Sequence, residues 1–249
     1  MIKYFFFIFL FFISNVYAYE RVHIAVSSNF IEPLDLIKKQ FLKKNKIIIT
    51  TSKGSTAKLF AQIINNAPID IFLSADQLTI NKLPENKKIQ GSEFTYAIGK
   101  LVIFSKTKIL KQLKLEKFLS QKLSNKIVIG NPKFSPYGLA SKQVLKSLGI
   151  WSLFKNKIIL ASNINQVSSF IYSGNADLGI ISNSDKLKLK KYEFGHFKEI
   201  PQNLYSPIKQ DVILLENAKS NNKAKLFFNF LKSKDAKKII KSFGYRVID

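Results

Sequence analysis

Short apolar runs alternate with longer amphipathic stretches along most of this chain. The runs are rich in Val, Ile and Phe, which predicts buried strands, and the stretches repeat apolar residues every three or four positions, which predicts helices. The first part reads strand, helix, strand, helix, strand, at residues 21–27, 30–45, 46–52, 57–65 and 70–74. This order predicts a parallel sheet with right-handed crossovers.

A second unit of the same kind follows. A long apolar run at residues 94–105 predicts a strand that leaves one unit and enters another. Further strands are predicted at 127–130, 157–161 and 177–182, with helices at 138–147 and 164–173. A return strand at 208–215 and a C-terminal helix at about 223–242 complete the pattern. We expect an α/β protein of two lobes, each with a parallel-type sheet: residues 19–97 with 208–249, and residues 98–207.

The N-terminus has the pattern of a signal peptide. Lys3 precedes an unbroken apolar run from Tyr4 to Ile13, and Val16-Tyr17-Ala18 is a small-x-small cleavage pattern. The run is shorter than the roughly twenty apolar residues that a membrane helix needs. The alternative is a short N-terminal anchor. We expect residues 1–18 to be removed after Ala18, which implies a bacterial periplasm.

Composition adds a strong positive charge and no cysteine. The formal charge is +24, and loss of Lys3 with the signal peptide leaves +24 − 1 = +23. The lysines are spread over almost every polar helix face and form no stripe with aromatic residues, so a nucleic-acid partner is not favoured. Without cysteine, neither a lipid-anchored start nor a disulfide framework is available.

Four predicted strands end in small polar or glycine-flanked turns that lead directly into helices. Helix starts carry unpaired N–H groups and about half a positive charge each, so every junction is a potential anion pocket. Because ligands of open parallel sheets bind at the carboxyl ends of strands, the two lobes would present these junctions to a common cleft. The four junctions are Ser27-Ser28-Asn29, Gly54-Ser55-Thr56, Ser135-Pro136-Tyr137-Gly138 and Ser162-Asn163-Ile164.

Six segments in fixed order resemble the periplasmic molybdate-binding proteins of ABC importers, from Val22 to Tyr245. The resemblance implies a two-lobed periplasmic binding protein of type II that captures molybdate, with tungstate as a second ligand, and delivers it to a membrane permease with its ATPase. The segments are Ala25–Phe30, Gly54–Ile63, Asn66–Asp76, Gly130–Gly138, Ser173–Gly179 and Leu231–Tyr245.

The resemblance also implies the site. The first lobe would contribute Ser28 and Asn29, then Ser55 and Thr56; the second would contribute the backbone around Tyr137 and the N–H of Ile164. Asn29 stands where many members have serine, and Ser182 stands where some have a tyrosine that contacts the ligand, so Ser182 is left out. The metal is held as an oxyanion, without direct protein–metal ligands and without a cofactor.

The chemistry of the junctions agrees with this ligand. Four helix starts would supply about two positive charges, which matches a fully ionised tetrahedral dianion. Asn29 with Glu32 also forms a capping-box pattern, so an ordinary helix cap is the alternative reading of Asn29. No Asp or Glu falls in a junction to accept the proton of hydrogen phosphate, so we expect phosphate to bind poorly.

Other functions remain open. Within the same class, the ligand would be sulfate or another tetrahedral oxyanion, because these share charge and shape. A basic protein that binds nucleic acid or anionic lipid is a second alternative. An enzyme on a two-lobed scaffold is not favoured, because nucleophile-elbow, phosphate-loop and zinc motifs are missing from the sequence. A monomer is expected.

Overall fold

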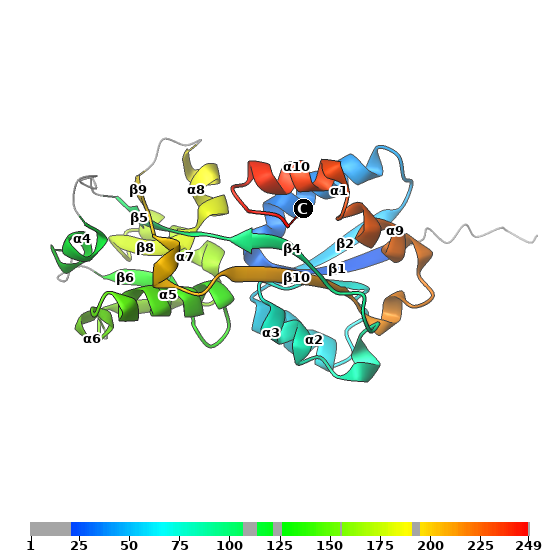
Figure 1. Ribbon diagram of the computed structural model, residues 1–249, viewed down its shortest axis with the longest axis horizontal. Helices are drawn as coiled ribbons and strands as arrows, with labels where there is room; N and C mark the ends of the chain where they lie inside the picture. Colours follow the sequence, from blue (N-terminus) through cyan, green and yellow to red (C-terminus); the bar gives the residue numbers. More distant parts are fainter. Residues whose placement is uncertain (1–20, 107–113, 122–125, 155, 191–194, 249) are drawn as a thin grey trace, which may run out of the picture.

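The computed structural model describes residues 21–106, 114–121, 126–154, 156–190 and 195–248. The described chain forms two α/β lobes that lie side by side along the long axis of the molecule (Figure 1). Each lobe is built on a five-stranded sheet, as the alternating pattern predicts in outline. The predicted signal peptide lies outside the described residues. No helix in the described part of the chain is both long and apolar enough to cross a lipid bilayer.

The first lobe has the strand order β2-β1-β3-β10-β4. Strand β1 pairs in parallel with β2 and β3, whereas β10 is antiparallel to both of its neighbours, so the sheet is mixed rather than parallel throughout. Its strands are β1 (Arg21–Ser27), β2 (Ile48–Gly54), β3 (Ile71–Leu73), β4 (Phe94–Gly99) and β10 (Ile208–Leu214).

Helices cover both faces of this sheet (Figure 1). One apolar core lies beneath α1 (Ile31–Leu42), α9 (Asn222–Phe230) and α10 (Lys234–Ser242). A second, smaller core lies beneath α2 (Thr56–Ile64) and α3 (Gln77–Asn81). Short 3-10 turns complete the lobe: η1 (Ser28–Phe30), η2 (Glu85–Lys87) and η4 (Glu216–Ala218).

The second lobe has the strand order β7-β6-β8-β5-β9. Strand β6 is parallel to β7 and β8, and β5 is antiparallel to β8 and β9. Its strands are β5 (Leu101–Ser105), β6 (Ile127–Gly130), β7 (Ile158–Ala161), β8 (Leu178–Ser182) and β9 (His196–Glu199). Its helices are α4 (Leu115–Gln121), α5 (Pro136–Ser147), α6 (Trp151–Phe154), α7 (Ile164–Tyr172), α8 (Asn183–Lys190) and the 3-10 turn η3 (Gln202–Leu204).

The chain passes between the lobes twice. The apolar run predicted as one strand is two strands, β4 and β5, which end and begin on either side of Lys100 and belong to different sheets. The return leads from η3 into β10. The predicted division of the chain at residues 97/98 and 207/208 stays a prediction.

The predicted C-terminal helix is also two helices. Helix α9 ends at Phe230, and Ser233 begins α10, where its hydroxyl accepts a 3.2 Å hydrogen bond from the N–H of Ala236. Side-chain capping by Ser233 favours the start of a new helix at this point, although the apolar pattern continues across it. This allows α10 to pack beside α1 (Figure 1).

Candidate ligand-binding site

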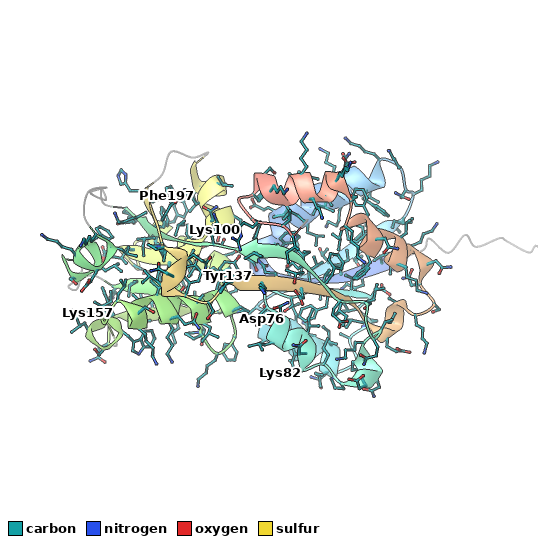
Figure 2. The ribbon with its side chains drawn as sticks, in the orientation of Figure 1. Asp76, Lys82, Lys100, Tyr137, Lys157 and Phe197 are labelled. Atoms are coloured by element: carbon teal, nitrogen blue, oxygen red, sulfur yellow. The ribbon has the colours of Figure 1, made fainter. Side chains whose placement is uncertain are left out.

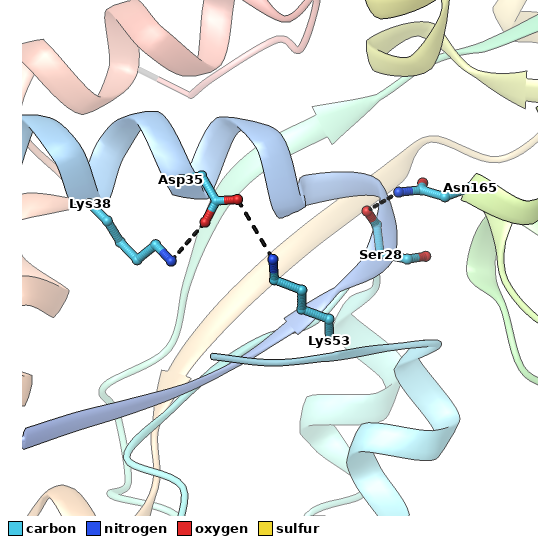
Figure 3. Close-up of polar contacts among 5 residues, drawn as sticks. All are labelled: Ser28, Asp35, Lys38, Lys53 and Asn165. Atoms are coloured by element: carbon cyan, nitrogen blue, oxygen red, sulfur yellow. Dashed lines mark hydrogen bonds and ion pairs between the residues drawn. The ribbon is translucent and has the colours of Figure 1, made fainter. Parts of the chain in front are cut away.

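The fold brings the predicted junctions of the two lobes into contact. The N–H of Ala57, at the start of α2, donates to the carbonyl oxygen of Phe134 before α5, at 3.3 Å. The Asn165 side chain on α7 donates to the carbonyl oxygen of Ser28 at 2.8 Å (Figure 3). Starts of α2, α5 and α7 therefore lie around η1, although they come from distant parts of the sequence.

Ser28 and Asn29 form the turn η1 directly after β1, and both are buried. The capping box predicted for Asn29 is wrong, because Phe30 holds the N-cap position of α1 and makes no side-chain cap. The Asn29 amide instead donates to the side chains of Gln210 at 2.7 Å and Tyr245 at 3.1 Å. The Asn29 side chain thus bonds to residues distant in the sequence, whereas the local pattern predicts that it caps α1.

Ser55 and Thr56 begin α2. Ser55 is at the N-cap position but its side chain makes no cap hydrogen bond, and it is only half-buried. The Thr56 hydroxyl is buried at 2.9 Å from the hydroxyl of Ser27. Ser27 was not predicted as a site residue, and this contact shows that it holds the Thr56 side chain in place.

The third junction depends on close packing of backbone. Ser135 caps α5 by accepting from the N–H of Gly138 at 3.3 Å. A Cβ on Gly138 would lie 2.2 Å from the carbonyl oxygen of Gly130, so only glycine fits there. Tyr137 lies in the first turn, where backbone N–H groups have no partner inside a helix. Its ring is buried and carries its hydroxyl toward η1, 3.4 Å from the Asn29 amide nitrogen.

The fourth junction starts α7. Asn163 caps the helix, and its side chain accepts from the N–H of Gln166 at 3.2 Å. This leaves the N–H of Ile164, the first helical residue, outside the capping bond. Ile164 is buried.

The two lysines that flank the second junction, Lys53 and Lys58, are exposed at the surface. Lys53 contacts Asp35, with its Nζ 3.7 Å from the carboxylate, and Asp35 also binds Lys38 at 2.7 Å (Figure 3). The polar groups offered by the junctions are therefore neutral hydroxyl, amide and backbone N–H groups. Among the described residues, His, Asp and Glu side chains form no group of three that could hold a metal ion.

Three buried tyrosine hydroxyls adjoin the junctions. Burial raises the pKa of Tyr245 to about 12, and burial followed by the neighbouring Tyr245 raises the pKa of Tyr137 well above its ordinary value. Burial likewise raises the pKa of Tyr96. All three stay neutral at physiological pH and act as hydrogen-bonding groups rather than charges.

Ser182 makes contacts next to the junctions. Its hydroxyl lies 2.8 Å from that of Ser184. The same hydroxyl accepts a hydrogen bond from the N–H of Asp185 in the first turn of α8, so that Ser182 caps this helix. Ser184 in turn donates to the carbonyl oxygen of Asn29 at 3.2 Å.

Several residues at the site were not predicted from the sequence, namely Ser27, Asn165, Ser184, Gln210 and Tyr245. Gln210 stands in the predicted return strand between two charged residues, Lys209 and Asp211, so only the structure distinguishes it as a packed polar side chain. A buried polar side chain requires partners, and such a position therefore indicates a tertiary hydrogen bond.

Comparison with known proteins agrees with this architecture. The Molybdate-binding protein ModA of Azotobacter vinelandii is 38% identical over 226 residues, covering 90% of this chain and 89% of that protein. ModA of Rhodobacter capsulatus is 35% identical, covering 89% and 86%. The solved structure of the Azotobacter vinelandii periplasmic molybdate-binding protein superposes with a TM-score of 0.82 at 32% identity, covering 92% of this chain and all of that one. The family described as bacterial extracellular solute-binding protein matches residues 22–246, and the chain belongs to that family.

Proposed function

We propose that this protein captures molybdate, and tungstate as a second ligand, in the periplasm and delivers it to the permease of an ABC importer. The observation that carries the proposal is the meeting of four helix-start junctions from two lobes, all with neutral donors. The similarity to two molybdate-binding proteins over about nine-tenths of the chain supports the choice of ligand.

Oxyanion binding at this position follows from the donors. The N–H groups of Tyr137 and Ile164 would donate from the second lobe, and Ser28, Asn29, Ser55 and Thr56 would donate from the first. Asn29 would use its backbone N–H, because its side-chain amide donates to Gln210 and Tyr245. Helix starts favour negative charge, and several of them together compensate a dianion without a buried lysine. Fixed neutral donors also avoid the desolvation cost of burying an ammonium group.

The same donors explain why binding would be reversible and non-catalytic. The four junctions contain no nucleophile paired with a base and no carboxylate. The oxyanion would be exchanged intact, as a carrier requires, with no cofactor. We expect a monomer, released to the periplasm after cleavage behind Ala18.

Calorimetric titration of the chain beginning at Tyr19 tests the proposal. Molybdate, tungstate, sulfate and phosphate are each titrated at moderate salt. One-to-one binding of the first two, with sulfate and phosphate much weaker, supports the carrier. Tight binding of sulfate would keep the binding class but change the ligand, and binding of none would reject the oxyanion site.

A matched pair of variants locates the site. Thr56→Val keeps the shape of the side chain but removes its hydroxyl, and Thr79→Val makes the same change on α3, at a residue outside the four junctions. Loss of molybdate affinity in the first variant alone places the ligand at α2. Equal affinity in both would reject this position.

A further inference from the structure

Gln210 is a fully buried polar residue on β10, the strand that carries the chain back from the second lobe. The ladder between β10 and β4 shifts register between Gln210 and Asp211. A buried carboxamide is costly unless both its donor and its acceptor are satisfied. The partners of its oxygen and of its nitrogen therefore indicate the role of the Gln210 side chain.

The acceptor end faces the first lobe. The Oε1 atom of Gln210 accepts from the Asn29 amide at 2.7 Å and lies 3.2 Å from the Tyr96 hydroxyl. The Asn29 amide is also fixed from its other side, because it donates to the Tyr245 hydroxyl at 3.1 Å. The Tyr245 hydroxyl in turn donates to the carbonyl oxygen of Asn29 at 2.7 Å. Asn29 is thereby held in one orientation.

The donor end faces the second lobe. The Nε2 atom of Gln210 donates to the hydroxyl of Tyr137 at 3.1 Å. Tyr137 belongs to α5, and Figure 2 places it where β4 and β10 pass between the lobes. Gly99 on β4 leaves room for this hydroxyl, since a Cβ there would lie 2.1 Å from it. Tyr137 is therefore held against both crossing strands at once.

We propose that Gln210 is a positioning residue that couples the approach of the two lobes to the orientation of the ligand-binding groups. The inference rests on the proposed function. When α5 moves with the second lobe, the Tyr137 hydroxyl meets Nε2 of Gln210, whose Oε1 holds the Asn29 amide. The Gln210 carboxamide thus joins the start of α5 to η1 through bonds of 3.1 and 2.7 Å, beside the longer direct contact of 3.4 Å between the Tyr137 hydroxyl and the Asn29 amide. Neither link requires the ligand itself.

If Gln210 acts in this way, its hydrogen bonds make the unmodified protein release the oxyanion more slowly than variants that lack them. Gln210→Met keeps length and volume but removes both hydrogen-bonding ends, and Tyr137→Phe removes only the hydroxyl. Each change is expected to weaken molybdate binding about tenfold, mainly through faster dissociation, which stopped-flow fluorescence measures. Gln143→Met is the matched control, because Gln143 pairs with Ser206 on the exposed surface and should leave release unchanged.

A double-mutant cycle separates positioning from a general loss of structure. If the two side chains act through one bond, the variant with both changes loses about as much affinity as either single variant. A purely structural role would give additive losses, together with lowered thermal stability of the ligand-free protein. Additive losses, or a wild-type release rate in Tyr137→Phe, would overturn the inference.

Molybdate binding by the unmodified protein distinguishes a failure of the proposed function from a failure of the proposed role of Gln210. An unmodified protein that does not bind molybdate refutes the proposed function, whatever the variants do. An unmodified protein that binds, with Gln210→Met folded and equal to it in affinity and release, refutes only the role of Gln210. If Gln210→Met does not fold, Tyr137→Phe still tests the link, because an unchanged release rate in that variant overturns the inference.

Discussion

The side chain of Asn165 on α7 donates a 2.8 Å hydrogen bond to the backbone carbonyl of Ser28 in η1. The bond joins residues 137 positions apart in the sequence and connects the two lobes directly beside the proposed ligand. Because it forms only when the lobes are together, its energy contributes to the closed state and not to either lobe alone.

Asn165→Ala should therefore weaken molybdate binding more than it weakens folding. Loss of one such bond is expected to lower affinity about five- to tenfold, as calorimetry would measure. Asn175→Ala is the control, since Asn175 is exposed and bonds only locally to Ser173. An equal loss in both variants would mean that Asn165 does not act across the lobes.

Gly138→Ala should destabilise the protein by about 2 kcal/mol or more, because the new methyl group would meet the backbone of Gly130 rather than a movable side chain. Thermal unfolding with and without molybdate measures the effect. Gly54→Ala is a suitable comparison, as a Cβ there makes only ordinary contacts of 3.6 Å or more. Stability equal to that of Gly54→Ala would show that the α5 start can shift.

Lys53→Gln should change molybdate affinity less than about twofold, because the Lys53 side chain is 45% exposed and directed to Asp35. The same reasoning predicts weak dependence on salt, in contrast to a protein that contacts many phosphates. Titrations at low and high salt test both statements. A steep fall in affinity with salt would point to cations at the site.

The buried tyrosines predict loss of stability at alkaline pH. Burial raises the pKa of Tyr245 to about 12 in the folded protein, whereas the ordinary pKa of tyrosine, which applies to the unfolded chain, is 10.0. The unfolded chain therefore releases this proton first, so the contribution of the group is complete below pH 10 and falls as pH rises toward 12.

Comparing thermal unfolding of the unmodified protein and Tyr245→Phe from pH 8 to 12 isolates this effect from that of the lysines. The difference in stability between them should shift in favour of the phenylalanine variant as pH rises. A constant difference would show that Tyr245 does not titrate on unfolding.

The local elements were the part of the fold that could be predicted from the sequence. Junctions such as Ser135-Pro136-Tyr137-Gly138 are short-range signals of capping and turn chemistry, and they located the helix starts well. The antiparallel place of β10 between β3 and β4 could not be predicted, since an apolar run does not encode the neighbours of its strand. The break at Lys100 was missed for the same reason.

The candidate site, too, could be predicted only where the signal is local. Ser55, Thr56, Tyr137 and Ile164 were named from helix-start patterns and resemblance, and the fold gathers the junctions that contain them. The environment of Asn29 was not foreseen, because a local capping box and a distant glutamine compete for one amide. Tertiary partners decided the outcome, and single-sequence periodicity carries no information on them.

The strand order of the first lobe also determines when that lobe can be completed during folding. Strand β10 lies between β3 and β4 but is separated from β4 along the chain by the whole second lobe. Until residues 208–214 have joined the sheet, β4 has no neighbouring strand in it. The second lobe can assemble from a continuous segment, so the half that begins the protein is the half that is finished last.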